Sequence, residues 1–206
     1  MILFACGASS AYGAWDTEGG WVARLRKSID QKGFEDFVYN LGISGNTTAD
    51  LIGRFDSEIR ARLKDAEGDD EEIIILFDIG KNDSAEWENS VSPADYEKNL
   101  SVLIALAQKY TANIAFLPIL PADERKTNPV SWDENLFYKN ENIRHYNEII
   151  QRVCDREKIV LIDITKLFVA TDLPDLLEDG LHPNDKGHDL IFQEVQSALK
   201  KLGWIS

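Results

Sequence analysis

The sequence has too few cysteines for a disulfide framework, because only Cys6 and Cys154 occur among its 206 residues. Both stand in apolar surroundings, and free buried thiols are typical of a reducing compartment. A bridge between the two is the less favoured alternative. Long hydrophobic runs are also missing, since none approaches the ~20 residues that a helix needs to span a bilayer. We therefore expect no stable membrane insertion.

Basic residues are scarce as well. Lysine and arginine number 22 against 36 acidic residues, which gives a net charge of -14. A field of this sign repels phosphate backbones and anionic lipid surfaces, so nucleic acid is not an expected partner. The apolar fraction of 44% is ordinary for a soluble globular protein and excludes a disordered chain. Repeats and Pro/Gly/Ser-rich linkers are absent, so we expect a single domain over residues 1–206.

The first six residues resemble a lipoprotein cleavage site only loosely. No Lys or Arg precedes the apolar stretch, which is too short for the core of a signal peptide. These residues are better interpreted as a strand. Together with the two free thiols, this interpretation predicts a cytoplasmic protein.

Short apolar runs alternate with amphipathic stretches along the chain. Runs such as Ile73–Phe77 lack polar alternation, which is typical of strands buried on both faces of a sheet. The five expected strands are Ile2–Cys6, Asp36–Leu41, Ile73–Ile79, Asn113–Leu117 and Ile159–Ile164. Apolar residues at helical spacing lie between and after them, in residues 21–29, 48–64, 96–107, 142–156 and 190–202. This alternation predicts an α/β fold with a parallel, doubly wound sheet.

Two segments do not fit the alternation. Asp65–Glu72 is a run of acidic residues, which we expect to be a solvated loop. Residues 119–137 are longer than a routine connection and follow the fourth strand, on the side of an open α/β sheet where ligands bind. They predict a lid or a substrate-binding loop, with a purely structural excursion as the alternative.

Four polar loops follow the carboxyl ends of strands or precede the last helix. They are Gly7–Gly13, Asn40–Asn46, Gly80–Asp83 and Asp179–Asn184. Because the carboxyl ends of parallel strands meet at one edge of a sheet, we expect these loops to converge there.

The residue types in these loops suit nucleophilic catalysis. A serine hydroxyl needs a base to take its proton, and His182 carries an imidazole, which titrates near neutrality. Asp179 precedes His182 by three residues in a glycine-containing turn and can orient the ring. Gly45, Asn82 and the backbone N–H of Ser9 can donate hydrogen bonds to a tetrahedral oxyanion.

Each of these patterns alone is weak, because Gly-x-Ser, Asp-x-x-His and Gly-x-Asn-Asp all occur in ordinary turns. The first loop could instead be a phosphate cradle, but it lacks the lysine of a P-loop and the Gly-x-Gly-x-x-Gly spacing. Their joint occurrence in this order favours hydrolytic chemistry. No set of His, Cys and carboxylate residues has metal-ligand spacing, so we expect no metal and no cofactor.

Taken in order, the four loops resemble the four blocks of the SGNH hydrolases, also called the GDSL lipase/acylhydrolase family. The resemblance runs from residue 2 to about residue 202. It implies Ser9 as nucleophile, Gly45 and Asn82 in the oxyanion hole, and the Asp-x-x-His pair at Asp179 and His182. It also implies a flavodoxin-like three-layer α/β/α sandwich with a five-stranded parallel sheet.

One position departs from the family pattern. The first block usually reads Gly-Asp-Ser, whereas here it is Gly7-Ala8-Ser9. The aspartate is not the triad acid in this family, so Ala8 need not abolish catalysis, although it removes a polar group beside the nucleophile. Ser10 is the only nearby competitor as nucleophile, and the motif match favours Ser9.

The function these residues predict is that of a serine esterase that hydrolyses O-acyl esters through an acyl-enzyme. The resemblance implies a lipid, a lysophospholipid or an acetylated sugar as substrate, and the polar residues 119–137 favour small or sugar esters. Acyl transfer to an alcohol is a variant of the same mechanism. The rival from another class is a non-catalytic small-molecule binding module. The oligomeric state stays open.

Two of three tryptophans are expected at the substrate and one in the core. Trp15 and Trp132 lie near the first loop or in residues 119–137, and we expect them to form part of the substrate wall. Trp21 has the helical spacing of a core residue.

Three further polar residues are expected to have structural or solvent-exposed roles outside the catalytic chemistry. His145 is expected on a polar helix face, and His188 in a packing or surface role, with the edge of the site as the alternative. Lys81 is expected to be exposed to solvent, with an anionic substrate group as its alternative partner.

Overall fold

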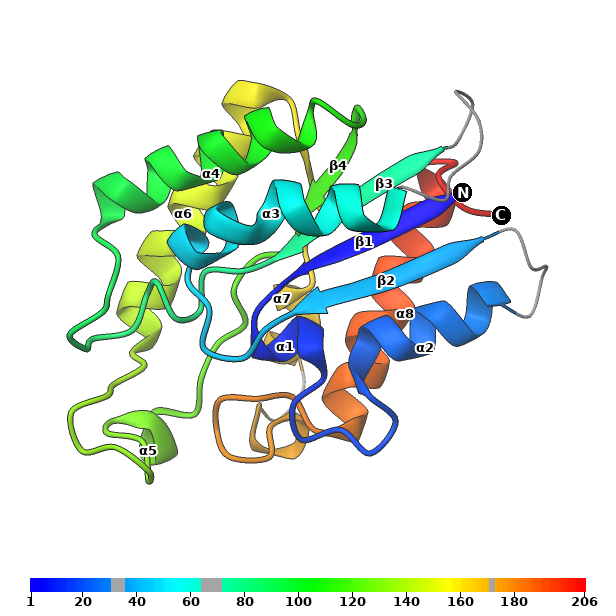
Figure 1. Cartoon of the computed structure of the whole chain (residues 1–206). Helices are drawn as coiled ribbons and strands as arrows, with labels where there is room; N and C mark the ends of the chain where they lie inside the picture. The colour runs from blue at the N-terminus through cyan, green and yellow to red at the C-terminus, as the bar shows by residue number, and fades with distance from the viewer. Residues whose placement is uncertain (31–35, 64–71, 171–172) are drawn as a thin grey trace.

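Within residues 1–30, 36–63, 72–170 and 173–206, which the computed structural model describes, the centre of the protein is a five-stranded parallel sheet (Figure 1). Its strands are β1 (Ile2–Gly7), β2 (Phe37–Gly42), β3 (Ile73–Asp78), β4 (Asn113–Phe116) and β5 (Val160–Leu161). The order β2-β1-β3-β4-β5 is that of a flavodoxin-like sheet, as expected. Residues 65–71 of the acidic run lie outside the described residues.

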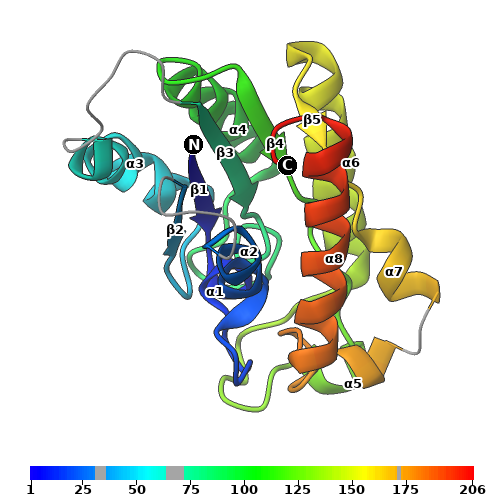
Figure 2. The same cartoon turned by 90° about the vertical axis from the view of Figure 1, so that its right-hand side faces the viewer.

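Helices cover both faces of this sheet (Figure 1, Figure 2). One layer contains α3 (Thr48–Leu63), α4 (Pro93–Ala107) and α6 (Asn140–Glu157), and the other contains α2 (Gly20–Asp30) and α8 (Asp185–Lys201). The shorter elements are α1 (Ser9–Tyr12), α5 (Glu124–Thr127), α7 (Thr165–Ala170) and a 3-10 turn at Leu173–Leu176. The three layers confirm the expected α/β/α sandwich.

Alternate side chains of the central strands enter opposite layers. Phe4 and Phe77 pack in the layer of α3 and α4, whereas Leu3 and Leu76 pack in the layer of α2 and α8. All four are fully buried, and burial of each contributes roughly 1.5–3 kcal/mol. Because both faces are covered, β1 and β3 are apolar apart from Asp78, the last residue of β3. Trp21 of α2 is also fully buried and belongs to this core, as its spacing predicted.

Local signals explain where several elements begin and end. Ser92 accepts a hydrogen bond from the N–H of Asp95 at 3.2 Å and caps α4, with Pro93 in the first turn. The fifth strand is shorter than expected, because it ends at Leu161. The Asp163 carboxylate accepts from both the N–H and the hydroxyl of Thr165 and so starts α7.

The order of the strands places the loops that carry chemistry. β2 is added on one side of β1, and β3 to β5 are added on the other side, so the strand order reverses between β1 and β3. In such a sheet, ligands bind at this point, beside the carboxyl ends of the strands. Ser9 follows β1 and Asn82 follows β3, so both lie at this point. Elsewhere, Cys6 in β1 and Cys154 in α6 are free and buried, and burial raises the pKa of each thiol to about 12.

Candidate active site

Ser9 is placed by a close approach of two strands. A Cβ atom on Gly7, the last residue of β1, would lie 2.3 Å from the carbonyl oxygen of Asp78 on β3, so only glycine fits there. The chain then turns into the four-residue helix α1, which begins at Ser9. Ala8 is buried at this turn, in the position where the family pattern has an aspartate.

Ser9, His182 and Asp179 form a continuous hydrogen-bonded chain. The Ser9 hydroxyl lies 2.9 Å from Nε2 of His182, and Nδ1 of His182 lies 2.7 Å from Oδ2 of Asp179. The carboxylate can only accept, so Nδ1 carries the proton and Nε2 presents its lone pair to Ser9. This is the geometry in which an imidazole can remove the proton of a serine hydroxyl.

Asp179 is held in its ionised form. Burial opposes ionisation, but hydrogen bonds from the His182 ring and from the N–H groups of His182 and Leu181 outweigh burial and lower the pKa of Asp179 to about 2. The aspartate therefore carries a full negative charge at neutral pH, and that charge can stabilise an imidazolium.

Ser10 has different partners from Ser9. Its hydroxyl is hydrogen-bonded to the carboxylate of Asp78, which also accepts from Nε1 of Trp21 at 3.0 Å. Burial raises the pKa of Asp78, and the two hydrogen bonds oppose that rise. Ser9 is thus the serine in contact with the imidazole, which agrees with the motif match.

The candidate oxyanion donors come from the loops after β2 and β3. Gly45 has a φ of 84°, in the left-handed region that glycine adopts without strain. Nδ2 of Asn82 donates to the carbonyl oxygen of Asn46 at 2.8 Å, and its Oδ1 accepts from the Tyr138 hydroxyl at 2.9 Å. These two contacts fix the amide orientation. Burial raises the pKa of Tyr138 to about 12, so its hydroxyl remains a donor.

Two further residues brace these loops, and sequence reasoning missed both. The buried carboxylate of Asp83 accepts from the N–H of Thr48 at 3.0 Å and from its hydroxyl, which joins the loop after β3 to the start of α3. Burial raises the pKa of Asp83 to about 6. Arg54 donates to the carbonyl oxygen of Gly7 at 3.1 Å and to Oδ1 of Asn46 at 2.8 Å. Only Asp83 had a sequence signal, as the last residue of Gly-x-Asn-Asp.

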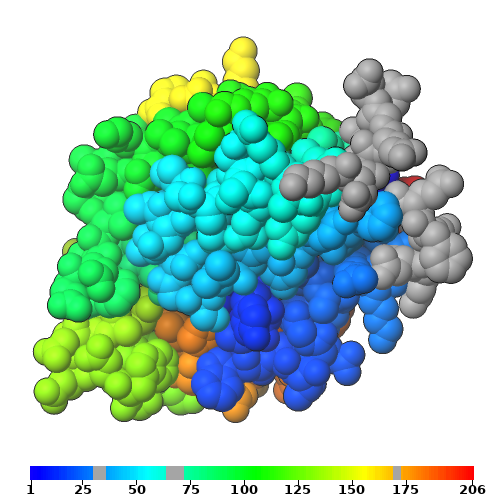
Figure 3. Space-filling view, in the orientation of Figure 1, coloured from blue at the N-terminus to red at the C-terminus, as the bar shows by residue number. Residues whose placement is uncertain are grey.

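The Ser9–His182–Asp179 chain, the candidate oxyanion residues and Tyr138 line one cleft of about 400 Å³. Its walls come from the four loops, from residues 119–138 and from Ala14, Trp15 and Trp87. The lining residues of the loops and of 119–138 are Ser9, Ser44, Gly45, Asn82, Trp132, Leu136, Tyr138, Asp179, Leu181 and His182. On the molecular surface, the segment around residue 180 (orange) lies between the N-terminal loop (dark blue) and residues 119–137 (yellow-green) (Figure 3). Residues far apart in the sequence therefore meet at one edge of the sheet.

This arrangement of strands and loops has counterparts in known proteins. Residues 5–190 match the model of the GDSL-like lipase/acylhydrolase family. The chain belongs to this family. It is a carboxylic-ester hydrolase, and the expected family is confirmed.

Two relatives and one solved structure cover most of the hydrolase. Esterase TesA of Pseudomonas aeruginosa is 26% identical over 203 residues, which is 98% of the hydrolase and 88% of TesA. The arylesterase of Vibrio mimicus is 24% identical over 185 residues, 89% of the hydrolase and 80% of the arylesterase. The lipase/acylhydrolase structure from Enterococcus faecalis has a TM-score of 0.76 at 21% identity and covers 100% of the hydrolase and 97% of that chain. This likeness confirms the fold.

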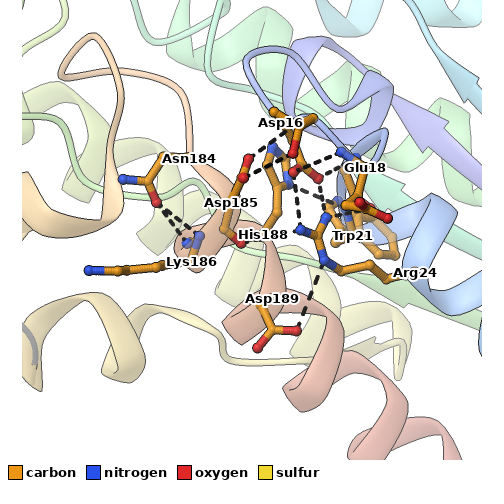
Figure 4. Close-up of polar contacts among 12 residues, drawn as sticks. Asp16, Glu18, Trp21, Arg24, Asn184, Asp185, Lys186, His188 and Asp189 are labelled. Carbon is orange, nitrogen blue, oxygen red and sulfur yellow. Dashed lines mark hydrogen bonds and ion pairs between the residues drawn. The ribbon is translucent and has the colours of Figure 1, made fainter.

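The loop of residues 13–19, which carries Trp15, is built around one carboxylate. Asp16 accepts from the N–H of Gly20 at 2.6 Å and of Glu18 at 3.3 Å, and it pairs with both arms of the Arg24 guanidinium (Figure 4). Burial opposes ionisation of Asp16, but these hydrogen bonds outweigh it and hold the pKa of the carboxyl well below its usual range. The loop is thus anchored to the first turns of α2.

The start of α8 holds the same loop from the other side. Asp185 accepts from the N–H and the hydroxyl of Thr17 at 3.1 and 2.9 Å. Nε2 of the buried His188 lies 3.4 Å from the carbonyl oxygen of Ala14. Between these contacts Trp15 adopts a φ of 64° and stays 63% exposed at the cleft. Trp15 and Trp132 therefore both line the cleft, and their role in the substrate wall stays a prediction.

Of the three other polar residues considered in the sequence, two lie as expected and one does not. His188 packs inside the protein, and His145 lies on an exposed helix face, as expected. The expectation for Lys81 was wrong, because its side chain is half-buried and Nζ donates to the carbonyl oxygen of Leu120. Burial lowers the pKa of Lys81 to about 7. Gly80, beside it, has a φ of 121°, a backbone conformation that favours glycine.

The part of the chain that the structure describes lacks two further features. No group of three or more His, Cys, Asp and Glu residues there could hold a metal ion. Across those same residues, no helix combines the length and the apolar character that crossing a bilayer requires.

Proposed function

We propose that the hydrolase is a serine esterase, with Ser9 as nucleophile, His182 as general base and acid, and Asp179 as the residue that orients and stabilises the imidazolium. The observation that carries this proposal is the chain of contacts of 2.9 and 2.7 Å from Ser9 through His182 to Asp179. We further propose that residues 1–206 form one hydrolase domain.

The chemistry has two stages. The Ser9 hydroxyl oxygen attacks the ester carbonyl carbon while its proton passes to Nε2 of His182. The N–H groups of Ser9 and Gly45 and the amide of Asn82 stabilise the resulting oxyanion. The intermediate collapses, the alcohol leaves with the proton from His182, and water then hydrolyses the acyl-enzyme. An alcohol in place of that water would give acyl transfer.

The cavities support short acyl groups. The cleft beside the triad measures about 400 Å³, near the lower end of the range for ligand sites. A second cavity, which shares Ser9 and His182 with the cleft and is also lined by Lys81 and Leu120, holds only about 20 Å³, which is too little for an acyl chain. Esters of acetate and other short acids, including acetylated sugars, therefore suit the site better than long-chain lipids.

Covalent labelling tests the nucleophile directly. A fluorophosphonate should label wild-type protein on Ser9, and Ser9→Ala should abolish both labelling and esterase activity. Ser10→Ala is the matched control, because Ser10 is adjacent but bonded to Asp78, and it should still be labelled. Wild-type protein that binds esters but is neither labelled nor active would indicate the non-catalytic binding module.

Two activity measurements test the remaining parts. The kcat/KM for nitrophenyl esters should be highest for acetate to butyrate and should fall for octanoate and palmitate. Chelators should leave activity unchanged, because amide groups stabilise the oxyanion in this mechanism. Activity lost in EDTA and restored by zinc or manganese would exclude the serine mechanism.

A further inference from the structure

Trp132 occupies a defined place beside the imidazole. Its ring centroid lies 6.4 Å from that of His182, with the two planes tilted by 31°. The side chain lines the same cleft as Ser9 and Asn82, yet it is 52% exposed. A large apolar face thus stands free next to the residue that moves the proton.

The segment that carries Trp132 is fastened to the turn that carries His182. The N–H of Asp123 donates to the carbonyl oxygen of Gly180 at 2.8 Å, and Nζ of Lys126 donates to that of Glu178 at 3.3 Å. Closer to the tryptophan, Val130 donates to Leu136 at 3.0 Å across the loop. The loop of Trp132 and the turn of His182 are therefore joined by two hydrogen bonds.

The positions of the nucleophile, the oxyanion donors and His182 determine which part of the ester lies against each wall of the cleft. The carbonyl oxygen must face Gly45 and Asn82, and the carbonyl carbon must lie against the Ser9 hydroxyl. When the C–O bond to the alcohol breaks, its electron pair goes to the alcohol oxygen, which takes the proton from Nε2 of His182. The alcohol part of the ester is consequently the part nearest His182, and so nearest Trp132.

We propose that the Trp132 face is the binding surface for the alcohol part of the ester, a conclusion that rests on the proposed serine mechanism. A flat indole face favours a six-membered ring over a short alkyl group, through stacking or C–H contacts. The hydrolase then selects esters whose alcohol carries such a ring, either an aryl alcohol or a pyranose.

A residue that binds the alcohol part affects acylation but not deacylation, whereas a residue that supports catalysis in general affects both steps. The alcohol is present during acylation and has left before water attacks the acyl-enzyme. Trp132→Ala should therefore lower kcat/KM about tenfold for esters of ring alcohols and leave the hydrolysis rate of a common acetyl-enzyme unchanged. Trp132→Phe keeps a flat ring and should retain most of the preference.

The experiment compares wild type and Trp132→Ala on acetates that differ only in the alcohol. The ratio of kcat/KM between the two proteins cancels the intrinsic reactivity of each ester. The ratio should be about ten for 2-naphthyl acetate, for an acetylated methyl xyloside or for both, and close to one for ethyl acetate. A loss with the naphthyl ester alone identifies an aryl alcohol, and a loss with the xyloside alone identifies a sugar.

A control and two contrary outcomes complete the test. Phe37→Ala removes another exposed aromatic residue, at the start of β2 and away from the cleft, and should change none of these ratios. An equal loss on all acetates, or a changed rate of acetyl-enzyme hydrolysis, would overturn the assignment of Trp132 to the alcohol side. Failure of the serine mechanism itself is recognised separately, by wild-type protein that fluorophosphonate does not label.

Discussion

The hydroxyl of Tyr138 donates to the amide oxygen of Asn82 at 2.9 Å and so decides which way that amide points. With its oxygen taken, the amide presents its nitrogen to the carbonyl oxygen of Asn46 and to the cleft. An oxyanion needs the nitrogen side, because within an amide only the N–H groups can donate a hydrogen bond to negative charge. Tyr138 is therefore a positioning residue for the proposed oxyanion hole.

Tyr138→Phe should lower kcat roughly two- to tenfold, the value of one hydrogen bond, with little change in KM. Asn82→Ala removes the donor itself and should cost about 10²–10³ in kcat. Steady-state kinetics on a nitrophenyl acetate measures both. Tyr146→Phe is the matched control, since that hydroxyl donates to the carbonyl oxygen of Val91 outside the cleft. An effect of Tyr138→Phe confined to KM would mean that the amide is oriented without it.

Asp179→Asn tests the orientation of the imidazole. An amide in this position can donate to Nδ1 and stabilise the wrong tautomer, so kcat should fall by up to about 10⁴, as in a serine-protease triad. Fluorophosphonate labelling of Ser9 should slow in parallel. A variant with wild-type kcat would show that the 2.7 Å contact between Asp179 and His182 is structural only.

Asp16→Asn tests the support of the loop that carries Trp15. The variant loses the charge that pairs with Arg24, so the loop should loosen, with a raised KM, a lowered Tm and a kcat within a few-fold of wild type. Glu18→Gln is the control, because this neighbouring side chain is exposed. Unchanged KM and Tm in Asp16→Asn would argue against this support.

His188 predicts a loss of stability in mild acid. Burial lowers its pKa from 6.5 to about 4, so the folded protein binds this proton less well than the unfolded chain. The stabilisation is complete above about pH 6.5 and is lost as pH falls toward 4, by about 3 kcal/mol over the whole window. Asp83 acts in the opposite sense, since its raised pKa of about 6 adds stability when it is protonated.

Chemical denaturation at pH 7 and pH 5 measures this effect. In the wild type, protonation of His188 should lower the free energy of unfolding at pH 5 relative to pH 7. The His188→Gln variant lacks this group and should keep or gain stability at pH 5 relative to pH 7. His145→Gln, at an exposed histidine, should behave as wild type. Parallel pH curves for wild type and His188→Gln would contradict the assignment.

The sequence by itself determined the layers and the loops. Apolar runs such as Ile73–Phe77 are local patterns, and a strand buried on both faces leaves that pattern wherever it occurs. The order of strands and helices, and the rule that ligands bind at the carboxyl ends of parallel strands, then brought Ser9, Gly45, Asn82 and the Asp179–His182 turn to one edge.

Only the tertiary structure decided which side chains meet. Ser9 and Ser10 are adjacent and chemically identical, and the start of α1 directs one to His182 and the other to Asp78. Tyr138 reaches Asn82 across 56 residues of sequence, and Lys81 is half-buried against Leu120. Such contacts depend on how separate loops pack against each other, and periodicity within one segment carries no information about its neighbour in space.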